Sequence, residues 1–139
     1  MQIQRIQTLM LLIAAIFIGV FCFTPFATVA AEGAEPTAMF VKDAPVLLIL
    51  NIVVAALLLI TIFMYHNLRQ QMKMTILAIV LICASMVTSG FVIGVGMENA
   101  TPVLLGGVVL LVLALLFALL AYRGMKRDHK LLRSMDRLR

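Results

Sequence analysis

The chain has 139 residues, of which 64% are hydrophobic and only 12% are charged, and its mean hydropathy is +1.16. Soluble domains are typically about half apolar and a quarter charged, and a chain this short buries too little surface to hide so much apolar material from water. The composition therefore excludes a soluble enzyme or a soluble binding domain, and it makes the distribution of the net charge of +5 the main question.

Four apolar segments are long enough to cross a bilayer as helices, which takes about 20 residues for a hydrocarbon core of ~30 Å. None of them has an Asp, Glu, Lys, Arg or His in its interior. Strands of a membrane barrel would be much shorter, with about 10 residues each. Because most connections are short, we expect an all-α integral membrane protein, an up-down antiparallel bundle of four transmembrane helices over residues 6–26, 45–65, 74–95 and 101–122.

The first segment has a second interpretation. Residues 1–31 also fit a secretory signal peptide, with Arg5, an apolar stretch and small residues up to Ala31 at plausible cleavage positions. A signal core usually has about 7–15 apolar residues, and the stretch here is longer. Its length favours a retained span, and a mass measurement on the mature protein would distinguish the two.

Residues 27–44 form the only long connection. They are rich in Ala, Gly, Glu and Pro, as in Glu32-Gly33-Ala34-Glu35-Pro36. This composition predicts a mobile, mildly acidic extracytoplasmic loop.

The basic residues define the orientation of the bundle. Only Lys42 falls on the side of the long loop, and the other ten basic residues fall on the opposite side. Since cytoplasmic connections carry the excess of Lys and Arg, both termini are expected to be cytoplasmic. The ten residues are Arg5, Arg69, Lys73, Arg123, Lys126, Arg127, Lys130, Arg133, Arg137 and Arg139.

Asn51 is the most polar residue in the interior of the four segments, and it is joined there by Thr61, Ser85, Thr88 and Ser89. Proton-coupled transport normally needs an ionisable group at membrane depth, and these segments have none. A lone Asn in a span more often hydrogen-bonds a neighbouring helix. We therefore interpret these residues as structural, and a small transporter or pore with a polar site near Asn51 is the alternative.

Pairs of small residues four apart occur in the third and fourth segments, with Gly90 and Gly94 in one and Ala114 and Ala118 in the other. Small residues at this spacing let helix backbones approach closely, so we expect these pairs to pack against neighbouring helices of the bundle, with packing between subunits as the alternative.

No residue set in the sequence has the chemistry of a catalytic, cofactor-binding or metal site. His66 and His129 lie at or beyond span ends, whereas a bundle that holds haem would place histidines at membrane depth. Cys22 and Cys83 lie at different depths and are interpreted as small buried apolar residues. We therefore expect a non-enzymatic protein with no cofactor and no metal.

Residues 123–139 predict a basic amphipathic helix on the cytoplasmic side, with Met125, Leu132 and Met135 on one stripe. It suits a topology anchor on anionic lipid headgroups or a docking helix for a membrane or cytoplasmic protein, in a monomer or an oligomer. Nucleic-acid binding is not expected, because no aromatic residue interleaves the basic run. The candidate interaction residues are Arg5, Arg123, Lys126, Arg127, Lys130, Arg133, Asp136, Arg137 and Arg139.

Both ends of the chain resemble one family. Residues 3–8 resemble the opening I-Q-R-I-Q-[ST], and residues 123–139 the closing pattern R-x-I-x-x-D-E-x-L-V-R-S-x-D-R-L-R, of small four-span membrane proteins from Bacteroidota, catalogued as domain of unknown function 4293. His129 stands where that pattern has Glu, and Leu132 where it has Val. The resemblance implies an inner-membrane protein with a retained first span, and it supplies no activity.

The predicted topology places both terminal motifs on one face of the membrane. We therefore expect their polar residues to form one cluster, with a contact between Arg5 and Asp136. The favoured function is a scaffold or accessory subunit that acts through its basic cytoplasmic face.

Overall fold

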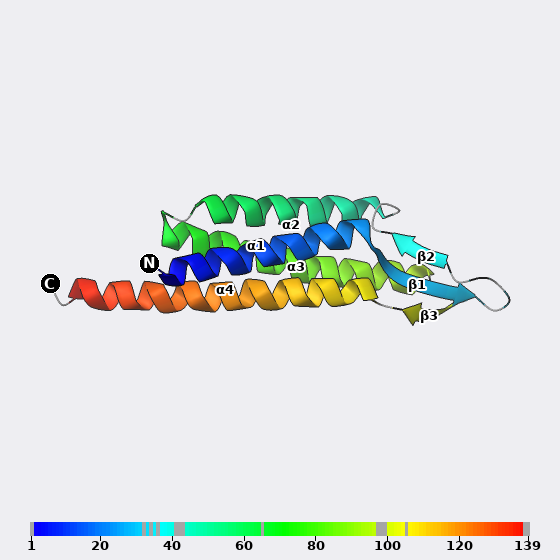
Figure 1. The fold of residues 1–139 in the computed structure, drawn as a ribbon. Helices are drawn as coiled ribbons and strands as arrows, with labels where there is room; N and C mark the ends of the chain where they lie inside the picture. The colour runs from blue at the N-terminus through cyan, green and yellow to red at the C-terminus, as the bar shows by residue number, and fades with distance from the viewer. Residues whose placement is uncertain are drawn as a thin grey trace.

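The computed structural model describes residues 2–31, 33, 35, 37–40, 44–64, 66–96, 100–104 and 106–137. Within these residues, four helices pack along one another in a single bundle (Figure 1). The chain termini lie at one end of the bundle, here called the terminal end, and a small sheet lies at the other, here called the sheet end. The helices are α1 (Gln2–Phe23), α2 (Pro45–Phe63), α3 (Leu68–Gly96) and α4 (Gly106–Arg137).

The helices form a closed ring of neighbours, in which α1 packs on α2 and α4, and α3 packs on the same two helices. All four are long and apolar enough to cross a membrane, which confirms the prediction of four helices of membrane-spanning length. Large apolar side chains cover their outer faces, and Phe23, Phe63 and Phe91 are 87%, 78% and 71% exposed. Such surfaces suit contact with lipid rather than water, as in a multi-pass membrane protein.

The core of the bundle is built from positions that alternate four and three residues apart. This spacing is the heptad pattern of helices that pack knobs-into-holes at a shallow angle. On α1 and α2 the buried positions at this spacing are Gln7, Leu11, Ala14, Ile18 and Phe21, and Leu47, Asn51, Val54, Leu58 and Thr61. On α3 and α4 they are Gln71, Thr75, Ala78, Ile82, Ser85 and Ser89, and Leu111, Ala114, Ala118, Ala121, Met125 and Asp128. Ala15 on α1 and Ile93 on α3 are buried as well, outside this alternation.

A three-stranded antiparallel sheet caps the sheet end, and the sequence did not predict it. Its strands are β1 (Pro25–Ala31), β2 (Thr37–Phe40) and β3 (Ala100–Leu104), in the order β2-β1-β3. Thr28 of the central strand pairs with Ala38 on one side and Leu104 on the other.

The sheet corrects the prediction of a mobile loop over residues 27–44 and shortens two predicted spans. The first helix ends at Phe23 because Pro25 disfavours helix at the residue before it. The fourth begins at Gly106, because the β-branched residues from 101 to 103 pair in β3, where Pro102 is tolerated on an edge strand.

The tail is helical as far as Arg137, as predicted, but it is the direct continuation of α4 rather than a second helix. No proline interrupts the segment, and α4 extends past the start of α1 at the terminal end (Figure 1).

Candidate functional site

The core positions nearest the terminal end are polar on all four helices. We call Gln7, Thr61, Gln71 and Asp128 the terminal polar layer, and their side chains are no more than 8% exposed. Buried polar groups of this kind require hydrogen-bond partners, because each unpaired group costs free energy.

One side-chain bond joins the start of α1 to the late part of α4. Gln7 Nε2 donates a hydrogen bond to Asp128 Oδ2 at 2.6 Å, across 121 residues of sequence. Gly124, one helical turn before Asp128, makes room for it, since a Cβ there would lie 3.1 Å from both Cγ and Nε2 of Gln7. The close approach of α1 and α4 at this point therefore depends on a glycine.

The other half of the layer joins α2 to α3. Gln71 Nε2 donates to the backbone oxygen of Thr61 at 3.2 Å. One turn further along α3, the Thr75 hydroxyl donates to the Gln71 carbonyl at 2.8 Å and lies 3.6 Å from the sulfur of Met125 on α4. Polar contacts thus connect α1 with α4, α2 with α3, and α3 with α4 at the terminal end.

The two terminal motifs do meet, but through residues other than those predicted. Gln7 is the second Gln of the opening motif, and Asp128 is the first Asp of the closing pattern. The Arg5 side chain lies outside the described residues, so the predicted Arg5–Asp136 contact is not described. Asp128 could have been found from its heptad spacing to Ala121 and Met125.

A pocket of about 290 Å³ lies between the α2–α3 connection and α4. We call it the basic pocket. Arg69 and Arg133 line it together with His129, and Asp136 is its one acidic residue. Its other lining residues are Asn67, Leu68 and Leu132.

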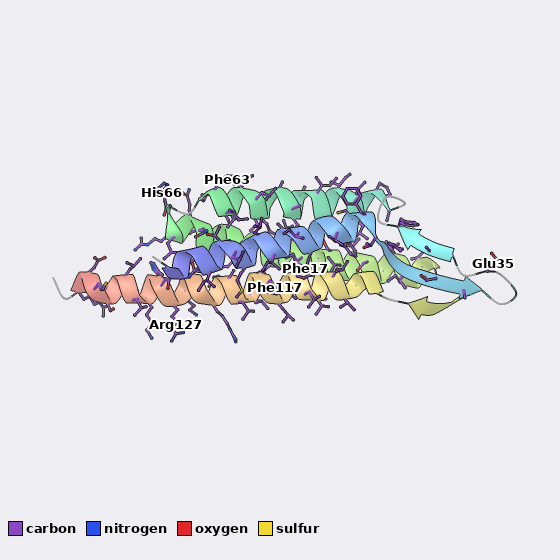
Figure 2. The ribbon with its side chains drawn as sticks, viewed as in Figure 1. Phe17, Glu35, Phe63, His66, Phe117 and Arg127 are labelled. Atoms are coloured by element: carbon purple, nitrogen blue, oxygen red, sulfur yellow. The ribbon has the colours of Figure 1, made fainter. Side chains whose placement is uncertain are left out.

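The basic pocket contains only some of the predicted interaction residues. It brings Arg133 and Asp136 together with Arg69 and His129. Neither Arg69 nor His129 was predicted as an interaction residue. Arg139 lies outside the described residues, and Figure 2 shows Arg127 on the outer side of α4. The remaining basic residues are exposed along the same helix and do not line the pocket, namely Arg123, Lys126, Lys130 and Arg137.

The last two turns of α4 lie at the terminal end, beyond the start of α1 (Figure 1). Every side chain from residue 131 to residue 137, here called the exposed tail, is exposed. The core stripe nevertheless continues at the same spacing from Asp128 to Leu132 and Met135, which are 51% and 67% exposed. The tail therefore carries an apolar stripe that the described part of the chain leaves largely exposed, and Leu132 at its start also lines the basic pocket.

The family model named Domain of unknown function (DUF4293) matches residues 3–138. The chain belongs to this family. No curated protein and no solved structure matches the chain. Both Gln7 and Asp128 lie within the matched DUF4293 region, so the contact between the two ends is part of the family domain.

Three of the four predicted intramembrane polar residues of this DUF4293 chain, Asn51, Thr88 and Ser89, bond to their own helices. Asn51 Nδ2 donates to the Leu47 carbonyl at 2.7 Å, so the described bond is not the interhelical one that was expected. Thr88, which is half-buried, and Ser89 donate to carbonyls of α3 at 2.8 and 2.9 Å. Asn51 Oδ1 and Ser85 Oγ are buried and have no hydrogen-bond partner among the residues that the structure describes.

The heptad spacing places these polar residues in different layers of the core. Counting core positions inward from the terminal polar layer places Asn51 in the same layer as Ile18, Ile82 and Ala118. Ser85 falls in the next layer toward the sheet end. Each therefore lies among apolar core residues, and neither lines the pockets described for this chain.

The small-residue pairs differ in their packing. Ala114 and Ala118 are fully buried, and next to them Phe117 stacks on Phe17 of α1 with ring centroids 5.6 Å apart (Figure 2). Gly90 and Gly94 are exposed, and a Cβ added at either would meet nothing within 4 Å. The prediction that this glycine pair packs a neighbouring helix is wrong within the bundle.

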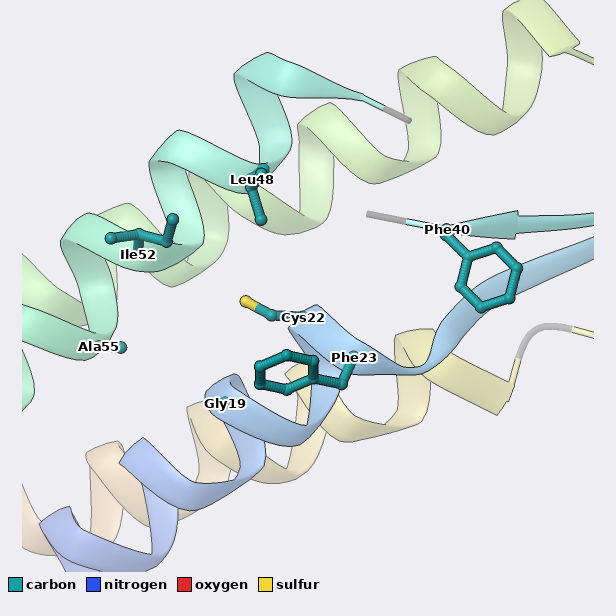
Figure 3. A pocket seen from close by; sticks show the side chains of 7 residues that line it. All are labelled: Gly19, Cys22, Phe23, Phe40, Leu48, Ile52 and Ala55. Carbon is teal, nitrogen blue, oxygen red and sulfur yellow. The ribbon is translucent and has the colours of Figure 1, made fainter. Parts of the chain in front are cut away.

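The two cysteines are free, and both lie away from the terminal end. Cys83 is exposed on the outside of α3, which corrects the expectation of burial. Cys22 is half-buried and lines an apolar pocket of about 480 Å³ between α1 and α2 beside β2 (Figure 3). The other lining residues are Gly19, Phe23, Phe40, Leu48, Ile52 and Ala55.

Proposed function

We propose that this DUF4293 chain is a multi-pass protein of the bacterial inner (cytoplasmic) membrane. Its helices run up-down antiparallel across the bilayer, with both termini in the cytoplasm. It is a non-enzymatic scaffold or accessory subunit that holds a protein partner at its basic cytoplasmic end.

The orientation is supported by the charges at the terminal end. Arg69 and Lys73 at the start of α3, and the basic residues from Arg123 onward on α4, lie at the same end of the bundle as the termini. Lys42 is the one basic residue in the connection at the opposite end. The positive-inside rule places such an end in the cytoplasm.

The observation that carries the functional proposal is the unpaired stripe of the exposed tail. A helix that had only to mark orientation would need basic residues, but it would not need to continue the core spacing to Leu132 and Met135. Because knobs on one helix require holes on another, this stripe suits a partner helix that extends the bundle into the cytoplasm.

The flanks of the stripe define the partner's chemistry. Arg133 lies beside Leu132 on the exposed tail, whereas Lys130, just before the tail, and Arg137 lie on the opposite face of the helix. A partner helix with an apolar stripe and an acidic residue facing Arg133 would complement both features, with the charges contributing mainly to the rate and specificity of association.

A transporter is less well supported. Proton-coupled transport calls for an ionisable group at membrane depth, and a pore calls for polar groups that face one another. The heptad spacing instead distributes Asn51 and Ser85 into different apolar layers.

Photo-crosslinking in native membranes tests the partner proposal. A photoreactive amino acid replaces Met135, on the stripe, or Arg137, on the opposite face of the same helix, in otherwise unchanged full-length protein. We expect a specific protein adduct from position 135 and several-fold less of it from position 137. Equal adducts at both positions, or adducts to lipid alone, would contradict a partner on the stripe and favour a tail that only contacts the membrane.

Thiol labelling tests the orientation. In a background with Cys22 and Cys83 replaced by Ala, single cysteines are introduced as Ala38→Cys in β2 and Ser134→Cys in the exposed tail. A membrane-impermeant reagent added to intact spheroplasts should label the first and leave the second unlabelled until the cells are lysed. The reverse pattern would place the termini outside.

A further inference from the structure

The basic pocket has the composition of an anion site. Arg69 comes from α3 and Arg133 from α4, so two arginines on separate helices line one pocket together with His129. Guanidinium groups bind phosphate oxygens through paired hydrogen bonds, and an imidazole N–H adds a further donor.

The first turn of α3 contributes a second feature that favours an anion. Asn67 and Leu68 at its start both line the pocket. The first N–H groups of a helix have no acceptor within it, and the helix dipole places partial positive charge at this end. Arg69 and the backbone therefore favour the same charge at the same place.

The pocket also lies at a suitable depth for a lipid headgroup. Arg69 precedes the apolar part of α3, which begins at Met74, by five residues, or about 7–8 Å of helix. The headgroup layer of each leaflet is roughly 5–8 Å thick. Leu68 and Leu132 add apolar surface beside the charged groups.

We propose that the basic pocket binds a phosphoryl oxyanion, held by Arg69, Arg133 and His129 at the start of α3. A membrane phospholipid and a soluble phosphate ester both present this group. The lipid source rests on the membrane topology proposed above, whereas the phosphate chemistry does not depend on it.

Asp136 allows the charge of the bound ligand to be tested. It is the one carboxylate in the pocket lining, and it would repel a bound anion across the pocket. The charge-removing substitution Asp136→Asn should therefore strengthen binding of an anion severalfold, whereas it would weaken binding of a cation.

The test uses purified full-length protein in detergent. Phospholipid retained from the membrane is counted by native mass spectrometry, and inorganic phosphate is titrated by calorimetry against delipidated protein. The pocket variant Arg69→Gln/Arg133→Gln should lower the affinity for either probe by at least about tenfold. The control Lys126→Gln/Arg127→Gln removes the same charge from exposed positions outside the pocket and should change affinity less than about twofold.

Each outcome decides the proposal. Retained lipid that is lost only in the pocket variant supports a lipid headgroup, and binding of inorganic phosphate without retained lipid supports a soluble phosphate ester. No binding of either probe, equal losses in the two double variants, or weaker binding in Asp136→Asn would overturn it. Circular dichroism shows whether each variant keeps its helices. The assay needs no protein partner, so a failure of the crosslinking experiment leaves it intact.

Discussion

The two ends of the bundle are closed by different chemistry. At the terminal end, side chains join the helices, as Gln7 does to Asp128. At the sheet end, backbone groups do so, through the pairing of β1 with β2 and β3. A backbone ladder tolerates many side chains, whereas a buried side-chain bond needs particular residues. Substitutions at the terminal end should therefore have the larger effects.

The largest effect is expected from Gly124→Leu. Even a Cβ at this position lies 3.1 Å from Gln7, so the larger side chain must displace Gln7 and leave the Asp128 carboxylate unpaired. Overpacking and the lost bond should together lower the free energy of unfolding by roughly 2–4 kcal/mol, after a gain of about 1 kcal/mol in helix propensity. Reversible unfolding in detergent micelles measures this.

Gly90→Leu is the matched control for that experiment. Gly90 is also helical, but a Cβ there meets nothing within 4 Å. Its free energy of unfolding should stay within about 1 kcal/mol of the original and rise if it changes. Equal losses in the two variants would mean that the contact with Gln7 is unimportant.

The same contrast explains what the sequence could predict. Span lengths and the basic tail follow from local composition, so four helices of membrane-spanning length were predictable. The pairing of β1 with β3 joins segments about 70 residues apart, and short strands bordered by apolar spans give no separate periodic signal. The burial of Asp128 was not predicted, because a carboxylate within a basic tail is expected to be exposed to solvent. One sequence feature did argue against exposure: no basic residue lies three or four positions away to form an ion pair on the helix surface, since those positions hold Gly124, Met125, Leu131 and Leu132.

A double-mutant cycle should give the next largest effect. Gln7→Ala and Asp128→Ala each break the bond between α1 and α4, so the double variant should be more stable than the sum of the single losses implies. Hydrogen bonds to charged groups predict a coupling free energy of about 2 kcal/mol. Asp128→Asn, which keeps an acceptor for Gln7 Nε2, is the control and should lose less than Asp128→Ala. Additive losses would contradict a direct bond.

At the sheet end, Thr28→Pro should have a smaller and more local effect. Thr28 has a paired strand on both sides, so proline removes a donor from the centre of the ladder. We expect faster amide exchange in β1, β2 and β3, a loss of about 1 kcal/mol, and unchanged protection in the helix centres. Thr28→Val, which keeps the backbone donor, should preserve the protection of the sheet. Loss of protection throughout the bundle would show that the sheet is needed to hold the helices together.

The smallest effect, and the one of opposite sign, is expected from Asn51→Leu. Asn51 is as buried as Gln7, and each has a side-chain oxygen without a partner among the described residues, but the one described bond of Asn51 is to its own helix. Leu is close to Asn in shape, is a better helix former and leaves no buried acceptor unpaired, so stability should rise by up to about 1 kcal/mol. Gln7→Leu should instead destabilise the protein, because it leaves Asp128 unpaired. If Asn51→Leu proves as destabilising as Gln7→Leu, then Asn51 has a partner across the bundle, and polar side chains join the helices along its length rather than at one end.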